Sequence, residues 1–238
     1  MTNGKLYVIG TPIGNLKDIT IRAIETLEKI DILVCEDSRV TSRLINHYLE
    51  NGMLTKKPRY VPYNEFNEDR IFQQVIDLIQ EGAQVGLVSD AGMPTISDPG
   101  YRVIRAALDA KLDLEVVPGP TALTTALAWS GIGGEMVLYV GFLPKTSGKA
   151  TRILEEAHTF MMALPSARLV MYVSPHRLLK DLALVQQVIG NAHCVLTREL
   201  TKQFAERIEG TASELLETYT KKKVKGELVL VIGVSDRT

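Results

Sequence analysis

Short apolar runs alternate with amphipathic segments along the first half of this 238-residue chain. The apolar runs predict strands at residues 6–9, 32–35, 60–62, 85–88 and 114–117. Between them, apolar side chains recur every three to four positions, which predicts helices at residues 19–30, 40–49, 68–80 and 101–110. Because parallel strands need helical crossovers, this alternation predicts a mainly parallel sheet covered by helices on both faces.

The pattern changes after Pro118-Gly119-Pro120, where a helix is expected at residues 121–129. Strands are then expected at residues 137–142, 169–173, 193–198, 205–208 and 228–234, with helices at residues 149–160, 176–189 and 212–220. Several of these strands adjoin short turns, which favours a mixed or antiparallel sheet with helices on one side. We therefore expect two α/β domains, residues 1–118 with a parallel sheet and residues 119–238 with a mixed sheet.

The charge is nearly balanced over the whole chain but differs between the halves. The formal net charge is −1, so no strong overall field attracts nucleic acid or membrane. Residues 1–117 hold 13 basic and 17 acidic side chains, and residues 118–238 hold 14 and 11. A polyanionic partner is therefore expected to meet the second half first.

Cysteine content and hydropathy indicate the cellular compartment in which the protein acts. Cys35 and Cys194 lie inside apolar runs and are expected to be buried thiols in a reducing compartment. Two thiols and four scattered histidines favour neither a disulfide framework nor a metal site. No secretory signal precedes Lys5, and no apolar stretch reaches the length of a membrane span. We expect a cytoplasmic protein with no membrane partner.

The turn region that follows the strand at 85–88 is the first candidate site. Residues 89–100 are rich in Gly, Pro, Ser and Asp, and they include Asp90 and Asp98. Open α/β sheets bind ligands beyond the carboxyl ends of their strands, and carboxylates there can accept hydrogen bonds from hydroxyls or an amine. A well-capped turn is the alternative, but the region is longer than capping requires, so we favour a site.

Other polar loops follow strands of the first half. Residues 10–16 are glycine-spaced, but Pro12 removes a backbone donor, which suits the wall of a site better than a phosphate cradle. Glu36 and Asp37 beside Arg39 can position a hydroxyl or accept its proton, or they can be the acidic start of a helix. Residues 62–68 are either a substrate loop or a helix cap.

Three further loops belong to the second half or its border. Thr121 and Ala122 can present backbone N–H groups to a carboxylate at the start of a helix. His176 lies in a Ser-Pro-His-Arg turn, although a plain first-turn helical position is the alternative. Arg198 and Lys202 can contact phosphates. The lysine-rich run at residues 221–225 is most often a solvated loop. Taken together, polar loops at strand ends in both halves indicate a small-molecule cleft between the domains.

The ordered set of these motifs resembles one family. The motifs are Gly10-Thr11-Pro12-Ile13-Gly14-Asn15-Leu16-Lys17-Asp18-Ile19-Thr20, Glu36-Asp37-Ser38-Arg39, Ser89-Asp90-Ala91-Gly92-Met93-Pro94, Ser97-Asp98-Pro99-Gly100, Pro118-Gly119-Pro120, Gly141-Phe142-Leu143-Pro144-Lys145, Ser174-Pro175-His176-Arg177, Arg198-Glu199-Leu200-Thr201-Lys202 and Gly226-Glu227-Leu228-Val229-Leu230-Val231-Ile232. They resemble the tetrapyrrole methylase superfamily of S-adenosylmethionine-dependent methyltransferases. Within it, they are most similar to the branch of small-subunit ribosomal RNA cytidine 2′-O-methyltransferases.

The resemblance implies a fold and a cofactor. It implies two α/β domains of the class III methyltransferase type, paired as a homodimer, with S-adenosylmethionine in the cleft between the domains. Loops that match the cofactor-binding loops of relatives contain Pro12, Ile13, Asp90, Met93, Thr121, Ala122, Tyr172, Val173 and Leu228.

The substrate implied by the resemblance is a cytidine ribose in small-subunit (16S) ribosomal RNA, free or within the 30S subunit. Methyl transfer from a sulfonium needs alignment of three atoms, and the ribose hydroxyl must lose a proton. We expect Glu36 or Asp37 to orient or deprotonate this hydroxyl. Substrate contacts are expected from Asn15, Arg39, His176, Arg177, Arg198, Glu199 and Lys202.

Four positions depart from residues common in the family, namely Ser38, Asn64, Val173 and Ala205. A histidine or acid that relatives use at the last three positions is therefore not available here. Two other functions stay open. One is a methyltransferase for a tetrapyrrole or a translation factor, although those relatives lack the Ser-Pro-His-Arg and Arg-Glu-Leu-Thr-Lys motifs. The other is an RNA-binding module without catalysis.

Overall fold

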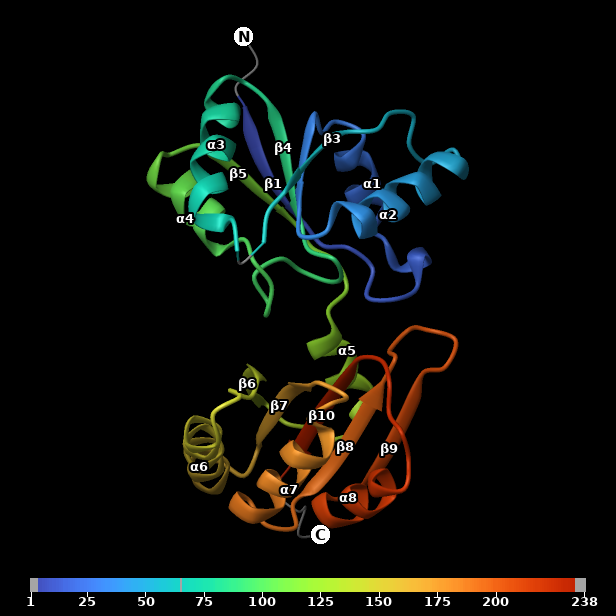
Figure 1. The fold of residues 1–238 in the computed structure, drawn as a ribbon, viewed down its shortest axis with the longest axis vertical. Coiled ribbons are helices and arrows are strands. Elements are labelled where there is room, and N and C mark those ends of the chain that lie inside the picture. The colour runs from blue at the N-terminus through green and yellow to red at the C-terminus, as the bar shows by residue number, and fades with distance from the viewer. Residues whose placement is uncertain (1–3, 65, 234–238) are drawn as a thin grey trace. The chain divides into compact units, whose positions relative to one another are not determined.

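The computed structural model describes residues 4–64 and 66–233, and the chain divides into two compact units after Thr121 (Figure 1). The boundary expected after residue 118 lies just before this division. None of the helices in the described ranges is long and apolar enough to cross a membrane. Each unit contains one five-stranded sheet.

The sheet of the first unit is parallel throughout, as predicted. Its strand order is β3-β2-β4-β1-β5. The strands are β1 (Lys5–Ile9), β2 (Ile32–Cys35), β3 (Arg59–Pro62), β4 (Gln84–Val88) and β5 (Asp113–Val117). The central strands β2 and β4 are almost continuously apolar because helices bury both of their faces.

Helices cover both faces of this sheet, as the alternation predicted (Figure 1). They are α1 (Ile21–Leu27), α2 (Ser38–Glu50), α3 (Glu68–Gln80) and α4 (Tyr101–Asp109). The first two pack with Ile9, Leu33 and Cys35. The other two pack against Leu6, Val8 and Val34 on the opposite face. α1 begins later than expected because Thr20 caps its first turn by accepting the Ala23 N–H at 3.1 Å, and it ends at Leu27 rather than at residue 30.

Parallel pairing places the carboxyl ends of all five strands at one edge of the sheet. The described parts of the loops that leave this edge are residues 10–15, 36–37, 63–64, 66–67, 89–100 and 118–121. A short 3-10 helix, η1 (Leu16–Asp18), which the sequence did not indicate, ends the first of these loops. The candidate motifs of the first unit thus share one edge, which we call the first edge.

The sheet of the second unit is mixed, again as predicted. Its order is β6-β7-β10-β8-β9, with β6 parallel to β7 and all other pairs antiparallel. The strands are β6 (Met136–Phe142), β7 (Ala167–Val173), β8 (His193–Arg198), β9 (Glu206–Thr211) and β10 (Leu228–Gly233). Val234, expected at the end of the last strand, lies outside the described residues. β9 extends beyond the expected residue 208 because the polar residues up to Thr211 continue its pairing with β8 at the border of the sheet.

The three helices expected after residue 148 lie on one side of the second sheet, as predicted, and α5 covers its other face. The helices are α5 (Ala122–Ser130), α6 (Ser147–Ala163), α7 (Leu178–Val188) and α8 (Ala212–Thr220). α6, α7 and α8 share one core with alternate residues of the strands, such as Leu228 and Leu230. α5 lies on the other face, where Arg207 Nε donates to the Trp129 carbonyl at 2.9 Å. Buried valines on that face, including Val195 and Val231, require this cover.

Strand register brings three loops of the second unit to one end of its sheet. Leu228 pairs with both Val173 and Arg198, and Arg198 pairs with Glu206. α7 begins at Leu178 rather than at His176, because the Arg177 N–H first closes a turn onto the Ser174 carbonyl at 2.9 Å. This end, the second edge, therefore carries the Ser-Pro-His-Arg turn, the start of the Arg-Glu-Leu-Thr-Lys loop and residues 226–227.

Candidate functional site

Close backbone contact joins three loops at the first edge. The Gly10 N–H donates to the Val117 carbonyl at 3.0 Å, and Thr11 and Gly92 exchange backbone hydrogen bonds of 2.9 and 3.1 Å. A Cβ atom added to Gly10 would lie 2.7 Å from the Cα of Gly119. Only glycine permits this approach, so the loop after β1 is held against the loops after β4 and β5.

Apolar side chains line the place where these loops meet. Ile13 is buried, and its Cγ2 lies 3.4 Å from the position of a Cβ built on Gly92. The Met93 Sδ lies 2.6 Å from the position of a Cβ built on Gly10. Pro12 is also buried. Three of the residues expected to bind a cofactor, Pro12, Ile13 and Met93, therefore lie on neighbouring loops.

The pKa values of two carboxylates at the first edge are shifted in opposite directions. Asp37 caps α2 by accepting the Arg39 N–H at 2.8 Å, and the Arg39 Nη2 donates to it at 2.6 Å. These bonds from Arg39 lower the pKa of Asp37 to about 2. The Asp37 N–H donates to Asp90 Oδ1 at 3.1 Å. Burial raises the pKa of Asp90, although the bond from Asp37 acts in the other direction.

The remaining candidates of the first unit occupy the same loops. Glu36 is half-buried between the end of β2 and the Asp37 cap. Asn15 is exposed and caps η1 by accepting the Lys17 N–H at 3.1 Å. Thr121, half-buried, ends the loop after β5. Ala122 is the first residue of α5 and belongs to the second unit.

The cofactor candidates of the second unit lie at the second edge. Val173 and Leu228 form a cross-strand pair and are 2% and 3% exposed. Their side chains belong to the core under α6, α7 and α8. Only their backbone groups are thus placed to reach a ligand. Tyr172 points to the other face and packs edge-on against Tyr139 and Phe142, with ring centroids 5.2 and 5.5 Å apart.

Glu199 joins two loops of the second edge. Its N–H donates to the Glu227 carbonyl at 2.9 Å, and its carboxylate accepts the Glu227 N–H at 3.0 Å. Lys202 Nζ donates to Glu199 at 2.9 Å and to Glu227 at 2.8 Å. Burial opposes ionisation of Glu199, yet the bonds from Lys202 and Glu227 leave its pKa lowered. The positive φ of 96° at Gly226 and its closeness to the Glu199 carboxylate exclude a side chain there.

Carboxylates also hold the other cations that were expected to contact phosphates. Arg198 Nε donates to Glu206 at 2.8 Å. Arg177 Nη2 donates to Asp181 at 2.8 Å, and Asp181 is only 2% exposed. Burial raises the pKa of Asp181, and Arg177 counteracts that rise. Arg39 pairs with Asp37 as described above, and His176 is exposed.

Several residues that shape these edges were missed by sequence reasoning. Gly119 and Gly226 were read only as parts of turns, although their Pro-Gly and Gly-Glu settings are typical of tight loops. The i, i+4 spacing of Arg177 and Asp181 in a predicted helix is a signal that could have identified their pair, whereas the pair of Lys202 and Glu227 is visible only in the fold.

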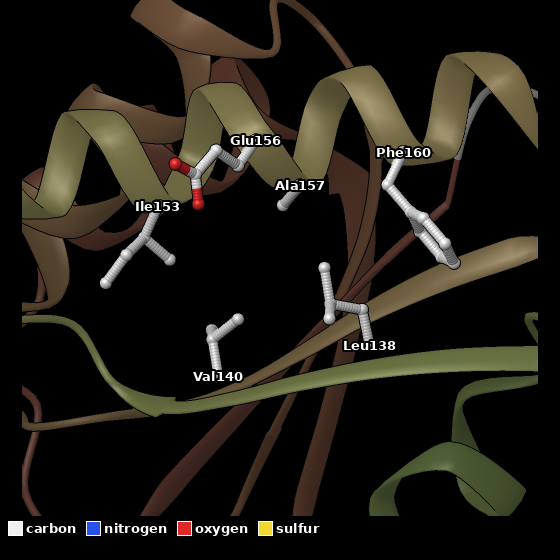
Figure 2. A pocket seen from close by; sticks show the side chains of 6 residues that line it. All are labelled: Leu138, Val140, Ile153, Glu156, Ala157 and Phe160. Atoms are coloured by element: carbon white, nitrogen blue, oxygen red, sulfur yellow. The ribbon is translucent and has the colours of Figure 1, made fainter.

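A separate groove lies at the outer border of the second sheet. It has a volume of about 450 Å³ and is lined by Leu138, Val140, Ile153, Glu156, Ala157 and Phe160. Figure 2 shows apolar side chains of α6 and β6 facing this groove, with the Glu156 carboxylate as its polar group. None of the predicted site residues lines it. Within residues 4–64 and 66–233, no group of three His, Cys, Asp or Glu side chains is arranged to hold a metal ion.

Comparison with known families identifies the fold. Residues 5–216 match the model of the tetrapyrrole (corrin/porphyrin) methylases. The chain belongs to this family. Solved members share its fold at low identity. Cobalt precorrin-4 methyltransferase has a TM-score of 0.68 at 18% identity, covering 96% of this chain and 94% of that chain. Uroporphyrin-III C-methyltransferase from Thermus thermophilus, complexed with S-adenosylhomocysteine, has a TM-score of 0.68 at 16% identity, with 97% of each chain covered.

Curated methylase relatives are much closer in sequence. A protein of Thermotoga maritima named Ribosomal RNA small subunit methyltransferase I is 40% identical over 97% of this chain and 98% of its own length. Proteins of the same name from Halalkalibacterium halodurans and Mycoplasmopsis pulmonis are 39% and 40% identical. They match over 96% and 97% of this chain, and over 75% and 98% of their own lengths.

Proposed function

We propose that this methylase transfers a methyl group from S-adenosylmethionine to the ribose 2′-oxygen of a cytidine in small-subunit ribosomal RNA. The observation that carries the proposal is the 40% identity over 97% of the chain to a relative named for methylation of this RNA. The tetrapyrrole enzymes with solved structures are only 16–18% identical, which supports a common fold and no common substrate.

The residues of the first edge suit this cofactor. Ile13 and Met93 offer an apolar wall, and the raised pKa of Asp90 marks a partly desolvated acceptor. A carboxylate of this kind can accept hydrogen bonds from ribose hydroxyls or from an amine. The close approach of Gly10 to Gly119 holds the loops after β1 and β5 together at this edge. When bound, S-adenosylmethionine supplies the electrophilic methyl carbon.

Asp37 and Glu36 have different roles in the proposed reaction. Asp37 is committed to the α2 cap and to Arg39, and a pKa of about 2 makes it a weak proton acceptor at neutral pH. Its N–H instead holds Asp90 in place. Glu36, adjacent and half-buried, is then the residue that orients the ribose hydroxyl and accepts its proton.

The proposal is tested by single substitutions in a methyl-transfer assay with purified small subunits and radiolabelled S-adenosylmethionine. Glu36→Gln is expected to lower kcat by about 100-fold or more, the usual contribution of a general base. Asp37→Asn is expected to lower it less, because Asn can still cap the helix. Unchanged turnover in Glu36→Gln would remove Glu36 from the mechanism. No transfer to RNA by the parent protein would refute the function itself.

We further propose that the enzyme is a homodimer that acts in the cytoplasm, where small subunits are assembled. β6 supports an assembly with a second copy because it is a border strand paired only with β7 among the described strands. Its residues Met136, Val137 and Phe142 are 37%, 41% and 53% exposed. An unpaired apolar border strand favours pairing with another chain. The two buried free thiols fit a reducing compartment.

A further inference from the structure

An exposed aromatic ring stands at the tip of the β8–β9 connection. The Ala205 N–H donates to the Lys202 carbonyl at 3.1 Å, which closes a tight turn with Gln203 and Phe204 at its tip. Phe204 is 71% exposed. A single exposed ring is ordinary on a protein surface, so its neighbours decide what it can do.

The neighbouring connection between α8 and β10 carries uncommitted positive charge. Lys222, Lys223 and Lys225 are exposed, and they form no ion pair among the described residues. Lys221 differs, because its Nζ lies 3.3 Å from Glu217. These lysines contrast with Arg198 and Lys202, whose charges are held by Glu206, Glu199 and Glu227.

Specific hydrogen bonds bring the two connections together. Arg198 Nη1 donates to the Lys225 carbonyl at 3.4 Å, and Lys202 Nζ reaches Glu227 at 2.8 Å. Figure 1 shows that the α8–β10 connection runs from α8 along the unit to the end of the second sheet that carries the β8–β9 connection. Arg198 and Lys202 thus hold the β8–β9 connection against the end of the α8–β10 connection. The side chains of the lysine run and of Phe204 are exposed to solvent.

We propose that Phe204, Lys222, Lys223 and Lys225 form an RNA-binding surface in which the ring stacks on an unpaired base and the ammonium groups contact flanking phosphates. The inference rests on the proposed function because it takes RNA as the substrate. An aromatic ring and cations on two joined connections are typical of single-stranded RNA binding, since every base offers a stacking face and every linkage a charge. In this proposal the lysine run, rather than Arg198 and Lys202, binds the phosphates. Arg198 and Lys202 are positioning residues that hold the two connections together.

The stacking part is tested by exchanging one side chain. Phe204→Leu keeps an apolar side chain and removes the aromatic face, whereas Phe204→Tyr keeps the face. With a cytidine-containing single-stranded RNA oligonucleotide, Phe204→Leu is expected to raise Kd by about 5- to 100-fold, and Phe204→Tyr to leave it near the parent value. Equal affinities for the parent and Phe204→Leu, or equal weakening by both variants, would overturn the stacking assignment. Thermal melting checks that both variants fold.

The phosphate part is tested by the salt dependence of the same binding. Lys222→Ala combined with Lys223→Ala is expected to reduce the slope of log K against log salt by about 1.4, or about 0.7 for each phosphate that is no longer neutralised. Lys29→Ala combined with Lys111→Ala removes the same charge from exposed positions on the first unit. This control is expected to leave the slope unchanged. If the slope changed equally in both double variants, the loss of net charge alone would explain the effect, and the proposed site would be refuted.

Two further readouts separate this inference from the proposed function. Binding of S-adenosylmethionine, followed by calorimetry, is expected to be the same in the parent and in every surface variant. In methyl transfer to small subunits, Phe204→Leu is expected to raise KM with little change in kcat. A parent protein that binds RNA through this surface but transfers no methyl group would refute the function and leave the surface standing. An active enzyme whose KM is unchanged in Phe204→Leu would refute the proposed surface and leave the proposed function standing.

Discussion

The two edges of this methylase are built by different means. At the first edge, glycine backbones meet, and Asp90 accepts a backbone N–H without forming an ion pair among the described residues. At the second edge, each of Glu199, Glu206 and Asp181 holds a cation. The first edge therefore contains a partly buried carboxylate without an ion pair among the described residues, whereas at the second edge three carboxylates hold loops through ion pairs. The presence of a charged side chain in a motif does not by itself make it a ligand contact.

The largest effect that we expect is a loss of stability on substitution of Arg177, which tests whether this residue has a structural or a ligand-binding role. Arg177→Met leaves the buried Asp181 carboxylate without its partner, and we expect the free energy of unfolding to fall by about 3 kcal/mol. Arg152→Met is the matched control. It breaks a pair of the same spacing with Glu156 that is largely exposed, so its expected cost is at most about 0.5 kcal/mol. Urea unfolding measures both, and equal costs would contradict the structural role.

A smaller loss is expected when the glycine approach at the first edge is blocked. Gly10→Ala places a Cβ against the backbone of Gly119, and such overpacking is expected to cost about 2 kcal/mol and to weaken binding of S-adenosylmethionine. Gly148→Ala is the control, because its Cβ meets nothing within 4 Å and it lies in the first turn of α6. That variant is expected to be slightly more stable than the parent. A Gly10→Ala protein as stable and as active as the parent would show that this close approach is dispensable.

Weaker effects concern the pH dependence of the two carboxylates at the first edge, and they differ in sign. The lowered pKa of Asp37 stabilises the fold above the unfolded pKa near 4, and this contribution is lost as the pH falls toward 2. Asp37→Asn is therefore expected to be less stable than the parent at pH 7 and equal to it near pH 2. Urea unfolding across this pH range measures the difference.

The raised pKa of Asp90 has the opposite consequence. Its ionised form is penalised by burial, so this penalty is absent below the unfolded pKa and appears as the pH rises through the folded pKa. Asp90→Asn is expected to be more stable than the parent at pH 7, to lose that advantage below about pH 4, and to bind S-adenosylmethionine more weakly. Stability curves that shift in the same direction for both variants would contradict the contrast between the two carboxylates.

Much of the fold could be predicted from local patterns. β2, α3, β8 and α8 lie at the expected positions, because each combines a clear apolar period with polar or turn residues at its ends. Errors arose where a long-range contact decides the outcome. The sequence did not indicate which face α5 covers, because Arg207 and a buried valine face on the opposite side of the sheet hold it there. β9 continues through polar residues because β8 supplies its pairing.

The candidate site was less predictable than the fold. Polar loops after strands were sufficient to find Asp37, Asp90 and the loop around Ile13, because parallel strands must end at one edge. The Glu227 partner of Glu199 and Lys202 was not visible in the sequence. Glu227 lies far from Glu199 along the chain, so the bonds that commit Glu199 and Lys202 depend on the antiparallel register of β8 and β10.

The identity of the methylated atom decides between the proposed function and its alternatives. Small subunits incubated with the enzyme and labelled S-adenosylmethionine can be digested to nucleosides and analysed by mass spectrometry. We predict label in 2′-O-methylcytidine, formed by the parent and strongly reduced in Glu36→Gln. Label on a base rather than on the ribose, or no label in RNA while a tetrapyrrole is methylated, would contradict this prediction.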